Sequence, residues 1–519
     1  MVWPFAAMAH GMACWGCGHG RSLLGPCAVT NTNTIIVVPL QFFPTVAIPE
    51  FWLLRSFLTF SEKLPMTTLV KNSVSGNSSL SMPQELIDFT LDFLHDDIPT
   101  LRVCSLVSRA FLPCSRYHIY SNVFIVHTAE LDIFRKYAGQ LYQCQNLAAL
   151  LEYSPHVAPL VTRFGILAMS ESSFMEDVFT DTSLFPIIQS LLNLSHIEFI
   201  AGRNQGSWGD FPVATHKLFL AALRSLPLKT LILKGIDFQN DGRFEDVFTA
   251  AAANSALKHL SLVCENEGAE TSEPYPPIRP PTNGLPALES LSISGPGTPR
   301  NISWLFFTQS LYSISGIRRL SLQIYRGTPS SVIQSLLNEM QETLEYFTLD
   351  ISPQRDRKVG FDLSRHRNLS SFYIIVPDFP DFVPVPEMRL NPTLRTLIVE
   401  HVSRVWQSNL QYSLRICAEV DRLALPALER VHIRLHVSVH GMCYYYAHCN
   451  TCEVQVQNRD AGDLDSWKRQ VEESMPLLKD RGILEVETIK QRYIVSFSDR
   501  ADLDLFPVAR GNDRRLAFA

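Results

Sequence analysis

Apolar positions along the chain follow one spacing typical of helices and another typical of strands. Between residues 82 and 120 they recur every three or four residues in three short bursts, which predicts three helices. The first is expected to begin at Pro83, with Ser81 and Gln84 spaced as a capping box. Pro99 is expected to open the second helix. Three helices of this length cannot bury so many large side chains among themselves, so some apolar surface should face a partner protein.

A Leu-x-x-Leu-x-Leu pattern recurs downstream at intervals of 25 to 34 residues. The copies begin at Val161, Leu194, Leu228, Leu257, Leu288, Ile317, Leu344, Leu369, Leu394 and Leu428. Runs with helical spacing lie between copies, at 217–225, 247–256, 303–312 and 331–341. Repeated strand and helix units predict an α/β fold with parallel strands. A doubly wound sheet also alternates strands and helices, but one shared motif favours a solenoid.

The end of the chain is predicted to close this array. Trp467, Val471, Met475 and Leu478 have helical spacing and predict a closing helix, with Gly482 as its C-terminal stop. Residues 481–486 are expected to form a capping strand. Four parts are therefore predicted: a poorly structured extension at 1–80, a helical module at 81–125, the repeat array at 150–440 and a capping region at 441–519.

The helical module resembles the F-box family. The matching residues are Met82, Pro83, Glu85, Leu86, Ile87, Leu91, Leu94, Leu101, Cys104, Val107, Ser108, Arg109 and Phe111. The family usually carries Leu where this chain has Met82, and often Trp where it has Phe111. The resemblance implies docking on the adaptor subunit of an SCF ubiquitin ligase, and through it on a cullin. The implied adaptor-binding residues are Met82, Pro83, Glu85, Leu86, Ile87, Leu91, Leu94, Leu101, Val107 and Phe111.

The repeat array resembles leucine-rich repeats, although it lacks the family's Asn or Cys a few residues after each strand. The expected fold class is therefore α/β: an N-terminal three-helix F-box followed by an irregular leucine-rich-repeat-like solenoid. In each strand, the residue between the last two apolar positions faces away from the core. Besides Glu198, these residues are Ile232, Ser261, Ser292, Ser321, Thr348, Tyr373, Ile398 and His432. They are the expected binding surface for a protein substrate.

Composition limits which kinds of partner and which cellular compartment are expected. The formal net charge of −6 gives no basic field for phosphate backbones, so nucleic acid is not an expected partner. The apolar stretch 34–60 is interrupted by prolines and charges, so a membrane span is not expected. Eleven cysteines without regular spacing indicate reduced thiols and a cytoplasmic or nuclear protein.

The remaining chemistry gives no catalytic prediction. The clusters at Cys14, Cys17, His19 and Cys27, and at Cys443, His448, Cys449 and Cys452, do not have the paired spacing of a zinc site. No phosphate loop or nucleophile motif is present. We therefore expect no metal, no cofactor and no enzymatic activity. The F-box resemblance implies that the chain is the substrate-recognition subunit of an SCF-type ligase. The alternative is a repeat-protein scaffold or sensor without a ligase link, in which the helices only cap the array.

Overall fold

A computed structural model gives the structure of this chain and describes its elements in fourteen segments. The described residues are 82–126, 140–168, 178–179, 181–201, 212–235, 243–263, 287–295, 312–324, 330–351, 360–377, 389–403, 410–423, 425–438 and 461–491. All of them belong to the unit 80–519. The predicted extension at 1–80 and both cysteine clusters lie outside the described residues.

Three helices form the N-terminal module, as the spacing predicted. They are α2 (Gln84–Asp92), α3 (Ile98–Val107) and α4 (Leu112–Ser121). Pro83 is the N-cap of α2 and not its first helical residue, so that expectation is wrong. Ser81 of the predicted capping box lies outside the described residues. The Gln84 amide instead donates to Asp88 Oδ1 at 2.8 Å and to the carbonyl of Ala110 at 2.9 Å, which links the start of α2 to the turn before α4.

The start of α3 follows directly from its sequence. The Asp97 carboxylate accepts hydrogen bonds from the backbone N–H of Thr100 at 3.1 Å and from its hydroxyl at 2.6 Å. Pro99 occupies the first turn, where a missing N–H leaves no helical bond unmade. A small apolar cluster of Ile87, Leu91, Leu101, Cys104 and Ile119 holds the three helices together.

Within the described residues, thirteen parallel strands form one open sheet. The strands are β1 (Asn122–Val126), β2 (Gln140–Tyr142), β3 (Arg163–Ala168), β4 (His196–Ala201), β5 (Thr230–Lys234), β6 (His259–Val263), β7 (Ser290–Ser294), β8 (Arg319–Ile324), β9 (Tyr346–Ile351), β10 (Ser371–Pro377), β11 (Thr396–Ser403), β12 (Arg430–Ser438) and β13 (Leu484–Gln491). Every predicted Leu-x-x-Leu-x-Leu copy forms one of these strands. From β3 to β13 the strands lie in chain order, and the order reverses once, at the end where β3, β1 and β2 are neighbours in that sequence. A doubly wound sheet also reverses at a switch point, but here eleven strands, from β3 to β13, continue in one direction.

Helices connect many of the strands. They are α6 (Cys144–Tyr153), the 3₁₀ helix η2 (Pro155–Leu160), α8 (Leu184–Ser190), α9 (Val213–Ser225), α10 (Arg243–Ala252), α12 (Ser330–Glu339), α13 (Leu410–Asp421), α15 (Ala461–Ser474) and α16 (Pro476–Asp480). The runs predicted at 217–225, 247–256 and 331–341 correspond to α9, α10 and α12. Of the run 303–312, only Tyr312 is described, and it is not helical. The elements β1, β2 and α6 were not predicted.

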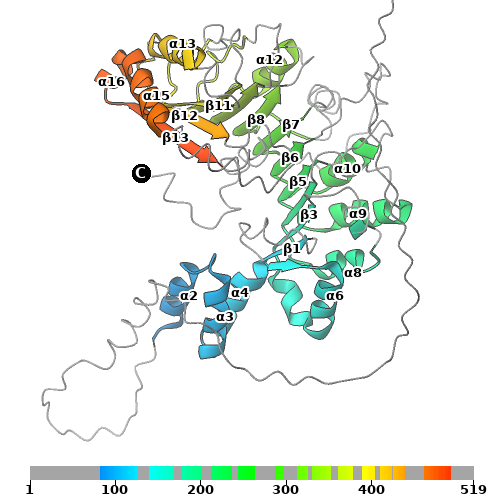
Figure 1. Cartoon of the computed structure of the whole chain (residues 1–519). Coiled ribbons are helices and arrows are strands. Elements are labelled where there is room, and N and C mark those ends of the chain that lie inside the picture. Colours follow the sequence, from blue (N-terminus) through cyan, green and yellow to red (C-terminus); the bar gives the residue numbers. More distant parts are fainter. Residues whose placement is uncertain are drawn as a thin grey trace, which may run out of the picture. The chain divides into compact units, whose positions relative to one another are not determined.

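The main core lies between the helices and one face of the sheet. It joins helix residues such as Phe219, Ile333 and Trp467 to alternate strand residues such as Leu231 and Leu233. Figure 1 shows α9, α10, α12 and α13 along the same side of the strands. Each strand therefore contributes its motif residues to one continuous core, because side chains alternate between the two faces of a strand.

A repeated set of hydrogen bonds joins consecutive strand units just before each strand begins. The backbone N–H of Lys229 donates to Ser195 O at 2.8 Å, that of Lys258 to Lys229 O at 2.9 Å, and that of Glu289 to Lys258 O at 2.8 Å. The same pattern continues with Arg318, Glu345, Ser370, Arg395 and Glu429 as donors. Each unit is therefore joined to the preceding unit by the same backbone hydrogen bond.

Buried polar side chains complete this ladder. Asn254 Nδ2 donates to the carbonyl of Leu226 at 2.5 Å, His366 Nε2 contacts the carbonyl of Leu337 at 2.9 Å, and Asn391 donates to the carbonyl of His366. Each lies three residues before the first motif position. These side chains precede the strands, whereas leucine-rich repeats carry their Asn or Cys after them, so the sequence comparison did not predict them.

The C-terminal end closes with a helix of 14 residues and a helix of 5 residues, and not with one continuous helix, which corrects the prediction. Pro476 disfavours helical backbone at Met475, so α15 ends at Ser474 and Met475 is the N-cap of α16. Gly482 ends α16 with a positive φ of 69°, as the stop signal predicted. The last strand begins at Leu484, three residues later than expected, because residues 481–483 form this turn.

Candidate functional site

Two groups of exposed apolar side chains lie on the helical module. We call Met82, Leu86, Phe89 and Phe93 the α2 apolar face, and Val103, Leu106 and Val107 the α3 apolar face; all seven are at least half exposed. Leu106 is the most exposed of them, at 87%. The rings of Phe89 and Phe93 pack edge to face with centroids 4.9 Å apart. These faces therefore offer large apolar groups to a partner.

Helix α2 carries two stripes of apolar residues, one packed in the module's core and one exposed on its surface. Ile87 and Leu91, one turn apart, are buried in the module's own cluster. Leu86, Phe89 and Phe93 have the same kind of helical spacing but lie on another side, where each is more than half exposed. Since the module itself covers only the inner stripe, the outer apolar stripe of α2 is available for a second partner.

The structure divides the ten predicted adaptor-binding residues into three groups. Met82, Pro83, Glu85, Leu86 and Val107 are exposed. Ile87, Leu91 and Leu101 are buried within the module, so they hold it together and cannot contact a partner directly. Leu94 and Phe111 are half-buried against the same cluster.

Four exposed side chains of the two faces were missing from the prediction: Phe89, Phe93, Val103 and Leu106. Their signal was available in the sequence, because 86, 89 and 93 form a second helical stripe beside 87, 91 and 94. These four positions are not part of the F-box motif, so the resemblance did not predict them.

The predicted substrate residues lie in one row across the sheet. Backbone pairing places Glu198 beside Ile232, and continues through Ser261, Ser292, Ser321, Thr348, Tyr373, Ile398 and His432. The shared register follows from the shared motif.

The row is not the open surface that the sequence analysis expected. Ile232, Ser261, Ser292, Ser321, Thr348, Tyr373 and His432 are buried, and Ile398 is half-buried. Serine side chains reach a shorter distance from the sheet than neighbouring Ile232 or Tyr373, which recesses them. No partner for the hydroxyls of Ser292 and Ser321 is found among the described residues.

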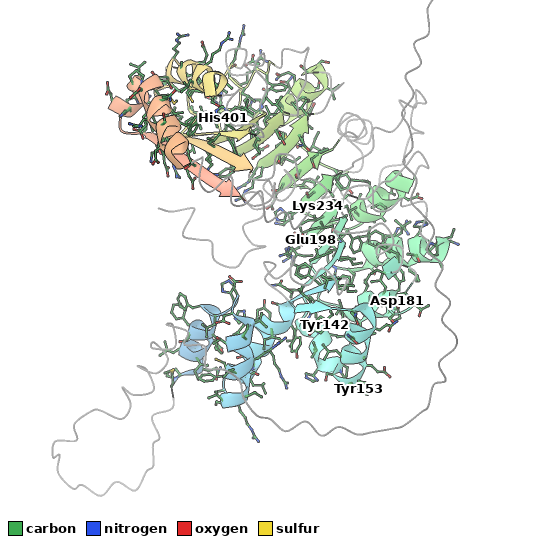
Figure 2. The ribbon with its side chains drawn as sticks, viewed as in Figure 1. Tyr142, Tyr153, Asp181, Glu198, Lys234 and His401 are labelled. Atoms are coloured by element: carbon green, nitrogen blue, oxygen red, sulfur yellow. The ribbon has the colours of Figure 1, made fainter. Side chains whose placement is uncertain are left out.

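Charged groups occupy the two ends of this row. Arg163 Nε donates to Glu198 Oε2 at 3.1 Å, and Lys234 on β5 is buried near the same carboxylate (Figure 2). Burial alone would raise the pKa of Glu198, but the Arg163 and Lys234 charges outweigh it and hold that pKa below its usual range. At the other end, His432 Nε2 lies 3.0 Å from Glu487 Oε2.

The thiols of the described residues have weak nucleophilic character. Burial raises the pKa of Cys144 and of Cys417 to about 12, and also raises those of Cys104 and Cys114. Such thiols are almost entirely protonated at neutral pH, whereas the thiolate is the reactive form.

Comparison with known proteins adds no further identification. No protein-family model matches the sequence, and no match is found among curated proteins. Within the described part of the chain, no helix combines the length and apolar character needed to cross a membrane.

Proposed function

We propose that this protein is the substrate-recognition subunit of an SCF-type E3 ubiquitin ligase. In this proposal the helical module is an F-box that docks on the adaptor subunit, and the sheet array is a leucine-rich-repeat-like solenoid that binds a protein substrate. The observation that carries the proposal is the pair of exposed apolar faces on α2 and α3, within a module whose residues resemble the F-box motif.

The division between buried and exposed residues supports docking by α2. The module already has an inner cluster, so Leu86, Phe89 and Phe93 are not needed to hold its helices together. Contiguous apolar area of this kind usually marks a protein contact, and an amphipathic helix against partner helices is a common form of it. Covering these side chains would bury the aromatic residues that dominate interface energetics.

Two observations support the solenoid. The strands from β3 to β13 follow chain order without a switch point. The same inter-unit hydrogen bonds recur before each strand from β4 to β12. Stacked units that contact only their neighbours give this geometry.

The role we propose is recruitment and not catalysis. A receptor of this kind accelerates ubiquitin transfer by raising the effective concentration of the substrate near a ubiquitin-loaded enzyme. The buried row across the sheet is less accessible than expected, so its role in substrate binding stays a prediction.

Copurification of the full-length chain with the SCF adaptor tests the proposal. Leu86→Asp and Leu106→Asp place a carboxylate on the α2 and α3 apolar faces, where both side chains are exposed and the module's own cluster stays intact. Losing a central apolar contact costs about 2 kcal/mol or more, so we expect adaptor binding to fall more than ten-fold.

Leu192→Asp is the matched control, because Leu192 is 72% exposed but lies in the array between α8 and β4. It should bind the adaptor as the unmodified chain does. If neither Leu86→Asp nor Leu106→Asp weakens adaptor binding, or if the unmodified chain does not bind it, the ligase assignment is wrong.

The second candidate is a scaffold or sensor in which the helices only cap the array. One observation favours it: α4 runs directly into β1, and Thr162 N donates to the carbonyl of Ser121 at 3.0 Å. Under this reading the unmodified chain shows no adaptor binding at all, so the same experiment separates the two candidates.

A further inference from the structure

Three side chains with different donor atoms meet between α2 and α4. Asp92 is the last residue of α2, and Cys114 and His118 lie one turn apart on α4. His118 Nε2 lies 2.8 Å from Asp92 Oδ1, and Cys114 Sγ lies 3.9 Å from the same oxygen. The three donor atoms all lie within 4.8 Å of one another.

These donors suit zinc. Zinc in proteins takes imidazole nitrogen, thiolate sulfur and carboxylate oxygen at about 2.0–2.3 Å. Tetrahedral placement at those lengths separates donor atoms by about 3.3–3.8 Å, close to the observed separation of Cys114 Sγ and Asp92 Oδ1. The shorter contact between His118 and Asp92 is a hydrogen bond, and it would open slightly when a cation replaces the shared proton.

Burial leaves the cluster supported on one side and accessible on the other. Cys114 and His118 are half-buried against the module, whereas the Asp92 side chain is 60% exposed. A cation could therefore reach the cluster, and solvent could supply a further donor. A site with three protein donors and one position for water is an established zinc arrangement.

Two further groups lie beside the cluster. His95 Nδ1 lies 2.8 Å from the backbone carbonyl of Asp92, and its ring centroid is 6.3 Å from that of His118. Cys114 Sγ also lies 3.8 Å from the backbone carbonyl of Asp88.

We propose that Asp92, Cys114 and His118 form a zinc site that fastens α2 to α4, with water in the fourth position. Zinc binding would release the thiol proton of Cys114 to solvent. A link at this place stabilises a module that is close to the lower size limit for independent folding. The proposal goes beyond adaptor docking and does not depend on it.

The alternative is that the three residues form only a hydrogen-bonded contact between two helices. That contact needs Asp92 and His118 but gains little from a thiol, since S–H is a weak donor. Replacing Cys114 therefore separates the two readings: it removes a zinc ligand while leaving the Asp92–His118 pair in place.

The test compares zinc content and cobalt spectra of the full-length chain and its variants after equilibration against buffered metal. Cys114→Ser and Asp92→Asn should each bind one equivalent less than the unmodified chain. The unmodified chain should also show a cobalt–thiolate absorption that Cys114→Ser loses. Because only differences are measured, metal held by other cysteines cancels.

Cys104→Ala is the matched control, since Cys104 is a thiol of the same module on α3 and is not part of the cluster. It should retain the full zinc content. Zinc should also raise the unfolding temperature of the unmodified chain more than that of Asp92→Asn. Asp92 is exposed, so this variant keeps the test decisive if Cys114→Ser folds poorly. Equal zinc content in the unmodified chain, Cys114→Ser and Asp92→Asn would overturn the proposal.

Discussion

The carboxylate of Asp421, at the end of α13, accepts a hydrogen bond from the backbone N–H of Leu478 in α16 at 2.9 Å. It accepts a second from the N–H of Leu477 at 3.2 Å. The side chain is buried, and it satisfies donors that a helix start leaves without intrahelical partners. Asp421 thus links the array directly to the C-terminal cap.

Asp421→Ala should destabilise this end of the sheet. A buried backbone N–H without a partner costs about 1–3 kcal/mol, so the urea midpoint of unfolding should fall. The midpoint of Asp421→Asn should fall less, because the amide oxygen can still accept one of the two hydrogen bonds. Equal midpoints for Asp421→Ala and the unmodified chain would show that the cap is held by other contacts.

Gly165 on β3 should tolerate no side chain while Phe124 is present. A Cβ at residue 165 would lie 2.6 Å from Phe124 Cε1 and 3.3 Å from the carbonyl oxygen of Glu198. Gly165→Ala should therefore cost about 1–3 kcal/mol through overpacking, and Phe124→Ala about 3–5 kcal/mol through the cavity left behind.

The double variant tests whether the two effects share a cause. If the ring is what excludes a Cβ, Gly165→Ala combined with Phe124→Ala should cost clearly less than the sum of the two single losses. Denaturant unfolding of the four proteins measures this difference. Strict additivity would mean that the ring of Phe124 does not limit residue 165.

The buried pair of Arg163 and Glu198 should be sensitive to loss of one partner. Arg163→Met leaves a buried carboxylate without its guanidinium, which costs about 3–5 kcal/mol. Arg318→Met is the control, because Arg318 and Glu345 form an exposed pair at 3.6 Å, worth about 1 kcal/mol or less. If both variants lose a similar free energy of unfolding, the buried pair does not contribute more to stability than the exposed pair.

The same pair predicts a pH dependence below neutrality. The pKa of Glu198 is lowered from 4.5 in the folded chain, so the unfolded state binds its proton first on acidification. The stability it contributes is complete above that ordinary value and is lost as pH falls through the folded pKa. Arg163→Met should raise the pKa of Glu198. On acidification, the free energy of unfolding of this variant should therefore begin to fall at a higher pH than that of the unmodified chain. An unchanged pH profile in the variant would refute this coupling.

His401 on β11 should make stability fall between about pH 6.5 and 4. Burial lowers the pKa of this imidazole from 6.5 to about 4, although the nearby Glu400 partly opposes the shift. The folded state then binds fewer protons than the unfolded state in that interval, so the unfolding free energy rises with pH.

His401→Gln should flatten this profile without abolishing it. The pKa of His196 is also lowered to about 4, mainly by burial, and that residue remains in the variant. Unfolding free energies at pH 4.5 and 7.5 measure the change. A slope equal to that of the unmodified chain would show that His401 does not titrate as its burial indicates.

The sequence by itself determined the three helices of the module and the strands from β3 to β12, although not β1, β2 or α6. The spacing near Leu101 identified three helices, and each Leu-x-x-Leu-x-Leu copy identified a strand, because these periods follow from local backbone geometry. Residues such as Leu231 and Leu233 reach the core for the same reason. The register of the polar row, from Glu198 to His432, also followed from the repeated motif.

Only the tertiary structure decided which side chains are covered. Leu86 and Ile87 are adjacent and both apolar, yet one is exposed and the other buried, because α3 and α4 cover a single side of α2. Ser261 was expected on an open face and is buried. Asp92 and His118 meet across 26 residues. Which side chains are buried, and which distant residues come together, depends on contacts between elements far apart in the sequence. The local spacing of apolar residues does not specify those contacts.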